Sequence, residues 1–172
     1  MVPVEMEVMY SLNVPVPGAV AERAWSIRSQ LLAYEQLRDE FTLVLKRLPF
    51  ESGIAVDSAI PDIRSQLESV DPFTVEITGI GQFETPPAGP APVIYFAISS
   101  PAMHRIHTRF VEYYGAVEEI EGTAYQPHIT LARGGDVTMP DIDFEPISWT
   151  VDRLIVWDSR RALPAAEFAL PV

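Results

Sequence analysis

The sequence contains no cysteine, and Lys46 is its only lysine among twelve basic residues. The absence of cysteine excludes disulfide bridges, thiolate metal sites and cysteine nucleophiles. Arg47, Leu48 and Pro49 follow the lysine, whereas a ligase that forms a covalent lysyl-nucleotide needs an Asp or Asn and then a Gly nearby. Any ligation by this chain would therefore be independent of ATP.

Long apolar runs are also missing, because no stretch approaches the ~18 apolar residues that a membrane-spanning helix needs. The first residues lack the basic-then-apolar order of a secretion signal, so we expect a cytoplasmic protein with no membrane partner. Because the net charge is -12, we do not expect an extended electrostatic interface with duplex DNA. A local basic pocket is compatible with this net charge. The excess of acidic residues together with a single lysine favours a protein adapted to concentrated salt. A GC-rich genome, which favours arginine codons over lysine codons, is the alternative explanation for the lysine count.

Two halves of the chain follow a similar pattern. Residues 8–12 alternate as a strand, and Val20, Ala24, Ile27 and Leu31 then recur at helical spacing. Residues 93–98 form a second predicted strand, after which Ser100 and Pro101 predict a helix start and Gly115 predicts its end. Each half continues into a further strand that contains Thr-Leu. This pattern predicts an internal duplication of a strand-helix-strand unit.

The remaining segments predict one α+β domain over residues 1–172. We expect a helix over residues 58–70, a strand over 73–78 that continues past two glycines to Phe83, and one long strand over 149–157. The two pseudo-symmetric lobes would span roughly residues 1–85 plus the C-terminal strands, and residues 86–145.

The second half carries a candidate catalytic strand, residues 126–133, which read Gln-Pro-His-Ile-Thr-Leu-Ala-Arg. His128 and Thr130 are two residues apart, so both side chains leave the same face of a strand. An imidazole titrates near neutrality and suits acid-base work, while a hydroxyl can hydrogen-bond a phosphate oxygen. The alternative is a core histidine that a backbone group satisfies.

The corresponding segment of the first half, residues 40–47, reads Glu-Phe-Thr-Leu-Val-Leu-Lys-Arg. Thr42 matches Thr130, but Glu40 stands where the second histidine would be. A bulge could bring Phe41 there instead, although Phe41 would then share an apolar face with Leu43 and Leu45. We assign the position to Glu40.

These motifs, the segments 78–83 and 93–95, and the duplication together resemble the 2H phosphoesterases over most of the chain. That family includes 2'-5' RNA ligase-like proteins and cyclic nucleotide phosphodiesterases. The resemblance implies a bilobal fold with antiparallel sheets around a central cleft. It also implies two His-x-Thr/Ser motifs that face each other across this cleft and act, without metal, on cyclic or 2'-5' phosphodiester bonds. It places His128 and Thr130 in the second motif, and leaves the first motif without its histidine.

Two functional outcomes follow. Glu40 could act as a general base while protonated His128 acts as the acid, but an ordinary glutamate pKa of ~4.3 gives a weak base, so burial would be needed to raise it. Alternatively, the cleft binds a nucleotide or RNA terminus without turnover. Thr42, Thr130 and an arginine, Arg133 or Arg47, would hold the phosphate in that case.

Lys46 shares the face of Glu40 and Thr42 by alternation, so it is a further candidate for phosphate binding, with a structural ion pair as the alternative. Arg133 begins on the face opposite Thr130 and would reach the cleft only near the strand end, or else remain solvated. These residues complete the predicted site, which comprises His128 and Glu40 as catalytic groups and Thr130, Thr42, Arg133 and Lys46 as phosphate ligands.

The other polar motifs do not predict a cofactor. His104 and His107 lie at helical i, i+3 spacing, but no acidic pattern completes a metal site, and we expect both to be partly exposed on their helix. The glycine pairs at 79 and 81 and at 134 and 135 lack the context of a nucleotide-binding loop. We expect a monomer that uses neither metal nor cofactor, and a protein-interaction domain on the same fold is the alternative outside nucleotide chemistry.

Overall fold

The computed structural model describes residues 9–171, and Val8, which belongs to the first predicted strand, lies outside them. The elements in chain order are β1 (Tyr10–Val14), α1 (Gly18–Ser26), β2 (Gln36–Leu37), β3 (Leu43–Leu48), α2 (Gly53–Leu67), β4 (Phe73–Phe83), β5 (Val93–Ser99), α3 (Pro101–Tyr114), β6 (His128–Arg133), β7 (Ile147–Val151), β8 (Arg153–Asp158) and β9 (Leu163–Ala169). Short 3-10 turns follow α1 at Arg28–Leu31 and precede β6 at Gly122–Ala124.

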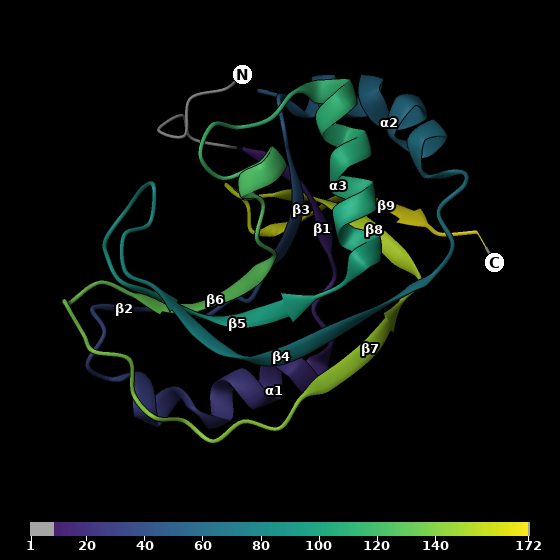
Figure 1. The fold of residues 1–172 in the computed structure, drawn as a ribbon. Coiled ribbons are helices and arrows are strands. Elements are labelled where there is room, and N and C mark those ends of the chain that lie inside the picture. Colours follow the sequence, from purple (N-terminus) through teal and green to yellow (C-terminus); the bar gives the residue numbers. More distant parts are fainter. Residues whose placement is uncertain (1–8, 172) are drawn as a thin grey trace.

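Two antiparallel sheets form the framework, in agreement with the predicted α+β class. One has four strands in the order β3-β1-β8-β9, and the other has five in the order β2-β6-β5-β4-β7. Figure 1 shows the second sheet curving around one side of the molecule, with α1 beneath it, while α3 covers the first sheet. The helix of each half therefore covers the sheet that contains the other half's motif strand.

The predicted lobe boundary near residue 85 does not follow the sheets. β4 precedes that boundary and yet pairs with β5, because the loop over residues 84–92 closes a β4-β5 hairpin. β2 and β7 also join this sheet, by pairing with β6 and β4. The sheets are thus interleaved along the chain.

Helix positions follow the apolar spacing closely. Val20, Ala24, Ile27 and Leu31 are all buried. Ser100 Oγ accepts a hydrogen bond from the Met103 amide at the start of α3, as predicted, and Gly115 ends the helix with a φ of 84°. The left-handed φ is the reason that a glycine stands there.

Two predicted boundaries are wrong. The helix expected over residues 58–70 begins at Gly53, because Ser52 caps it by accepting a hydrogen bond from the Ala55 amide, and Pro61 lies inside it. The single strand expected over 149–157 is two strands in different sheets, β7 and β8, which Asp152 separates. The Asp152 carbonyl accepts from the Leu170 amide, which fixes this crossing between the sheets.

Within residues 9–171, no helix combines the length and the apolar character that a membrane crossing requires.

Candidate functional site

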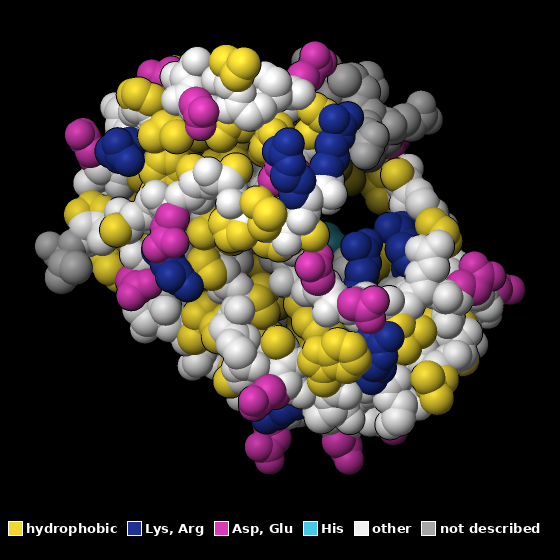
Figure 2. Space-filling view, turned by 180° about the vertical axis from the view of Figure 1, so that it is seen from behind, with side chains coloured by type: hydrophobic (Ala, Val, Ile, Leu, Met, Phe, Trp, Pro, Cys, Tyr) yellow, Lys and Arg dark blue, Asp and Glu magenta, His cyan; other side chains and the backbone are white. Residues whose placement is uncertain are grey.

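A cleft with a volume of about 460 Å³ is lined by residues of both motif strands. The two strands, β3 and β6, contact each other. Figure 2 shows the opening from behind, as a hollow with basic side chains gathered on its rim. Polar and charged side chains from both halves line it, and these are Arg38, Glu40, Thr42, Arg47, Thr85, Glu119, Gln126, His128, Thr130 and Arg133.

Five of the six predicted site residues are thus brought together in one cleft. His128 and Thr130 are half-buried on β6, and Thr42 is half-buried immediately before β3. Glu40 also lines the cleft, but it is exposed. The burial that would make Glu40 a useful general base is therefore missing.

His128 is fixed in one orientation. Its Nδ1 lies 2.7 Å from the Gln126 carbonyl, to which it donates, so Nε2 is left as an acceptor in the neutral ring. The rings of Phe83 and Tyr95 contact the imidazole edge-to-face, with centroids 5.0 and 5.4 Å away. Burial lowers the pKa of His128, and the nearby arginine charges lower it further, while the Gln126 carbonyl opposes them. In the free protein at neutral pH, His128 is consequently a proton acceptor and not the acid.

β-Bulges in both motif strands determine which side chains reach the cleft. Opposite β1, Leu12 pairs with Lys46 and Asn13 pairs with Val44, so Leu45 is the extra residue of β3. One extra residue reverses the alternation beyond it. Arg47 therefore faces the cleft, and Lys46 turns to the interior.

β6 contains a bulge of the same kind. Ile94 pairs with Ala132 and Tyr95 pairs with Thr130, which leaves Leu131 as the extra residue. Arg133 consequently shares the cleft face of Thr130, contrary to simple alternation. Its Nε donates to the Pro90 carbonyl at 3.0 Å and its Nη2 to the Ala88 carbonyl at 2.6 Å, so it also anchors the loop over residues 84–92.

Lys46 does not line the cleft, which corrects the prediction that it contacts phosphate. Its side chain is only 2% exposed, and Nζ donates to Glu121 Oε1 at 2.6 Å and to the Arg47 carbonyl at 2.6 Å. Burial lowers the pKa of Lys46, and the Glu121 carboxylate opposes that shift. The ion pair considered as its alternative role is what the structure contains, with a partner 75 positions away.

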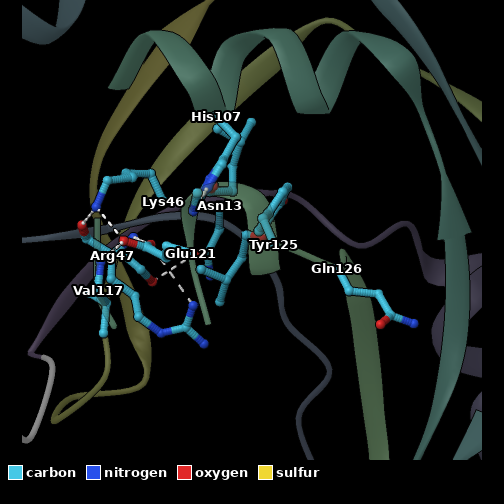
Figure 3. Close-up of polar contacts among 12 residues, drawn as sticks. Asn13, Lys46, Arg47, His107, Val117, Glu121, Tyr125 and Gln126 are labelled. Carbon is cyan, nitrogen blue, oxygen red and sulfur yellow. Dashed lines mark hydrogen bonds and ion pairs between the residues drawn. The ribbon is translucent and has the colours of Figure 1, made fainter. Parts of the chain in front are cut away.

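Glu121 joins this lysine to the backbone of the bulged strand (Figure 3). Its carboxylate also accepts hydrogen bonds from the backbone amides of Arg47 and Val117, both at 2.9 Å, and its Oε2 is 4.0 Å from Arg47 Nη1. The contacts with Lys46 and Arg47 lie next to the bulge at Leu45, and the contact with Val117 lies within the segment that carries Glu121. Glu121 thereby holds the backbone from which Arg47 extends into the cleft.

His107 and Tyr125 complete the support of β3. His107 is 2% exposed, contrary to the predicted partial exposure, because Nδ1 donates to the Leu45 carbonyl at 2.7 Å and Nε2 accepts from the Gly122 amide at 3.0 Å. Tyr125 stacks on it at 3.7 Å and donates to the Val44 carbonyl at 2.9 Å. Burial lowers the pKa of His107. This histidine has a structural role.

Arg38 also lines the cleft, although it is not among the site residues predicted from the sequence. It lies two residues before Glu40, so the alternation that placed Glu40 and Thr42 on one face would have found it. Among residues 9–171, no group of three or more His, Asp or Glu side chains gathers as a metal site would require.

A family model and several solved structures are similar to this chain. The sequence model of the 2'-5' RNA ligase superfamily matches residues 33–163. None of the curated proteins matches the chain by sequence.

Solved structures with a similar fold include LigT of E. coli in its apo form, at 18% identity and a TM-score of 0.67, covering 95% of this chain and 98% of that one. LigT with 3'-AMP gives 18% identity and a TM-score of 0.69 over the same shares of the two chains. The protein TT0787 of Thermus thermophilus gives 18% identity and a TM-score of 0.60, covering 94% of this chain and 97% of that one.

Proposed function

Because the chain belongs to the 2'-5' RNA ligase superfamily, we propose that its cleft binds a nucleotide or RNA terminus that carries a 2',3'-cyclic or 2'-5'-linked phosphate. The observation that carries this proposal is the convergence of Thr42, Thr130 and His128 from two motif strands on one cleft. Solved structures of LigT with phosphate and with 3'-AMP support a ligand of this class.

The phosphate is bound by groups of complementary chemistry. The hydroxyls of Thr42 and Thr130 donate to its oxygens, and the Arg47 guanidinium supplies a charge-assisted contact. The neutral His128 accepts through Nε2 from a ribose hydroxyl or from water. No metal or cofactor takes part in this scheme.

Glu40 decides between binding and turnover. In hydrolysis of a cyclic phosphate, a water oxygen bonds to phosphorus, His128 Nε2 takes the water proton, and the bond from phosphorus to a ribose oxygen breaks. That leaving oxygen then needs a proton, which an acid on the opposite strand must donate. An exposed carboxylate at neutral pH is an acceptor only. The arrangement therefore favours a binding protein with little turnover.

Calorimetry with a non-hydrolysed nucleotide, 3'-AMP, tests binding. We expect Thr130→Val and Thr42→Val each to weaken binding by about tenfold, which corresponds to one lost hydrogen bond to a charged group. Thr74→Val on the exposed face of β4 is the matched control and should bind as the unchanged protein does. No binding by the unchanged protein, at low or high salt, would refute the proposal.

A phosphodiesterase is the second candidate, and the free Nε2 of His128 favours it because the base that it needs is present. Incubation with a 2',3'-cyclic nucleotide and a 2'-5' dinucleotide separates the candidates. A binding protein is inert, and Glu40→His restores the missing acid and produces activity. A phosphodiesterase turns over without that change, and loses activity in His128→Ala.

A further inference from the structure

Two arginines form an edge of the cleft that the phosphate-binding scheme leaves unused. β2 pairs with the end of β6, where Gln36 lies opposite Arg133, and the Arg38 amide donates to the Leu131 carbonyl at 2.9 Å. Both Arg38 and Arg133 line the cleft. The two guanidinium groups therefore belong to adjacent strand ends.

Within the described part of the chain, this pair forms no ion pair with a carboxylate. Among residues 9–171, neither Arg38 nor Arg133 has an Asp or Glu oxygen within 4.0 Å. Arginines outside the cleft do make such pairs, namely Arg28, Arg153 and Arg161. Burial lowers the pKa of Arg133, and the charge of Arg38 lowers it further, so each guanidinium feels the other. Two like charges held together in this way favour an anion between them.

Arg133 and Thr130 pair with residues two positions apart on β5, so their Cα atoms are roughly 7 Å apart along the strand. Arg133 is directed away from the phosphate at Thr130. Its guanidinium is held further out by the carbonyls of Ala88 and Pro90. Those two bonds use Nε and one hydrogen of Nη2, so Nη1 keeps its donors. A second anion can occupy this place while the first is at Thr130.

We propose that Arg38 and Arg133 form a second phosphate subsite, so that the ligand is a nucleotide with phosphate on both the 5' side and the 2' or 3' side of its ribose. This inference rests on the proposed function, because the first phosphate occupies the position between the two threonines. An internal nucleotide of an RNA end has this chemistry, and a nucleoside monophosphate lacks it.

Calorimetry with two probes tests the second subsite. Adenosine 3',5'-bisphosphate should bind at least about tenfold more tightly than 3'-AMP, since it adds one set of charge-assisted hydrogen bonds. Arg38→Gln should weaken the bisphosphate at least about tenfold more than it weakens 3'-AMP. Arg38→Lys, which keeps the charge but loses the planar fork, should give an intermediate loss. Arg105→Gln removes the same charge from the exposed face of α3 and should leave the preference intact.

The outcomes separate this inference from the proposed function. Equal affinity for the two probes, or an equal loss for both in Arg38→Gln, would overturn the second subsite while 3'-AMP binding still supports the first. Failure of both probes to bind would overturn the proposed function and the second subsite together. A circular dichroism spectrum and melting temperature for Arg38→Gln, compared with those of Arg105→Gln, confirm that folded proteins are compared.

Discussion

The ammonium of Lys46 lies 2.6 Å from Glu121 Oε1, and the two side chains are 2% and 0% exposed. Both groups are satisfied, because each makes further hydrogen bonds to backbone of the bulged strand or of the segment beside it. The protein's only lysine is therefore used to fix the backbone next to the cleft, and no lysine is left to contact a ligand. This pair leads to the first prediction.

Breaking the pair should destabilise the fold strongly. Lys46→Met leaves the Glu121 carboxylate buried without its counter-ion, and we expect a loss of roughly 3–5 kcal/mol in the free energy of unfolding by urea. Glu167→Gln disrupts the half-exposed pair with Arg153 and should cost less than ~1 kcal/mol. Similar losses in the two variants would contradict the structural role of the buried pair.

Stability should fall when the pH drops below about 6.5. Burial lowers the folded-state pKa of both His107 and His128 from the ordinary value of 6.5, so the unfolded chain takes up protons at a pH where the folded protein does not. The free energy of unfolding should decrease by at most ~1.4 kcal/mol per pH unit per histidine, until the folded pKa is reached. Urea titrations between pH 7.5 and 5 measure this slope.

The histidine responsible can be identified by substitution. His107→Gln lowers stability at every pH, but it should also reduce the slope below pH 6.5, which a purely structural loss would not do. Arg105→Gln, on the exposed face of the same helix, is the control and should keep the slope. An unchanged slope in His107→Gln would show that this residue does not supply the linkage.

Arg133 should control the order of the loop over residues 84–92. Removing its guanidinium in Arg133→Gln leaves the Ala88 and Pro90 carbonyls without their donors, so amides of this loop should exchange hydrogen faster. Mass spectrometry of deuterium uptake checks this, with Arg105→Gln as the charge-matched control. Protection that survives in Arg133→Gln would mean that other contacts hold the loop.

Position 89, in the loop over residues 84–92, should not accept a residue with a side chain. Its φ is +78°, and an added Cβ would lie 2.5 Å from Arg133 Nη2. We expect Gly89→Ala to increase deuterium uptake in the same peptides as Arg133→Gln. Gly18→Ala, where an added Cβ has open space, is the control. Normal protection in Gly89→Ala would show that the guanidinium can move aside without loss of order.

Most of the predicted cleft residues could be identified from the sequence alone. Alternation and the repeated Thr-Leu pattern placed His128, Thr130, Thr42 and Glu40 together because those residues precede the bulges. Lys46 was misplaced because it follows one. Arg133 was expected to reach the cleft only at the strand end for the same reason. A bulge depends on how the neighbouring strand pairs, and a single strand's sequence does not reveal it.

Other features depend on partners distant in sequence. Glu121 is 75 positions from Lys46, and its position follows from how the segment before β6 packs on β3. The burial of His107 has the same origin, since its partners are Leu45 and Gly122. Periodicity identified the helix that carries His107, but it could not say what would pack against that face.

The paired bulges also constrain any transplantation of these strands. In each motif strand, the alternation of side chains reverses at the extra residue. The threonine hydroxyl that faces the cleft comes before this reversal, and the arginine that faces the cleft comes after it. If the segment were transferred without its extra residue, the histidine and the threonine would still face the cleft. The arginine, however, would follow simple alternation and face the interior. The transferable unit is therefore the whole segment from residue 128 to 133, extra residue included, together with the partner strand that accommodates it.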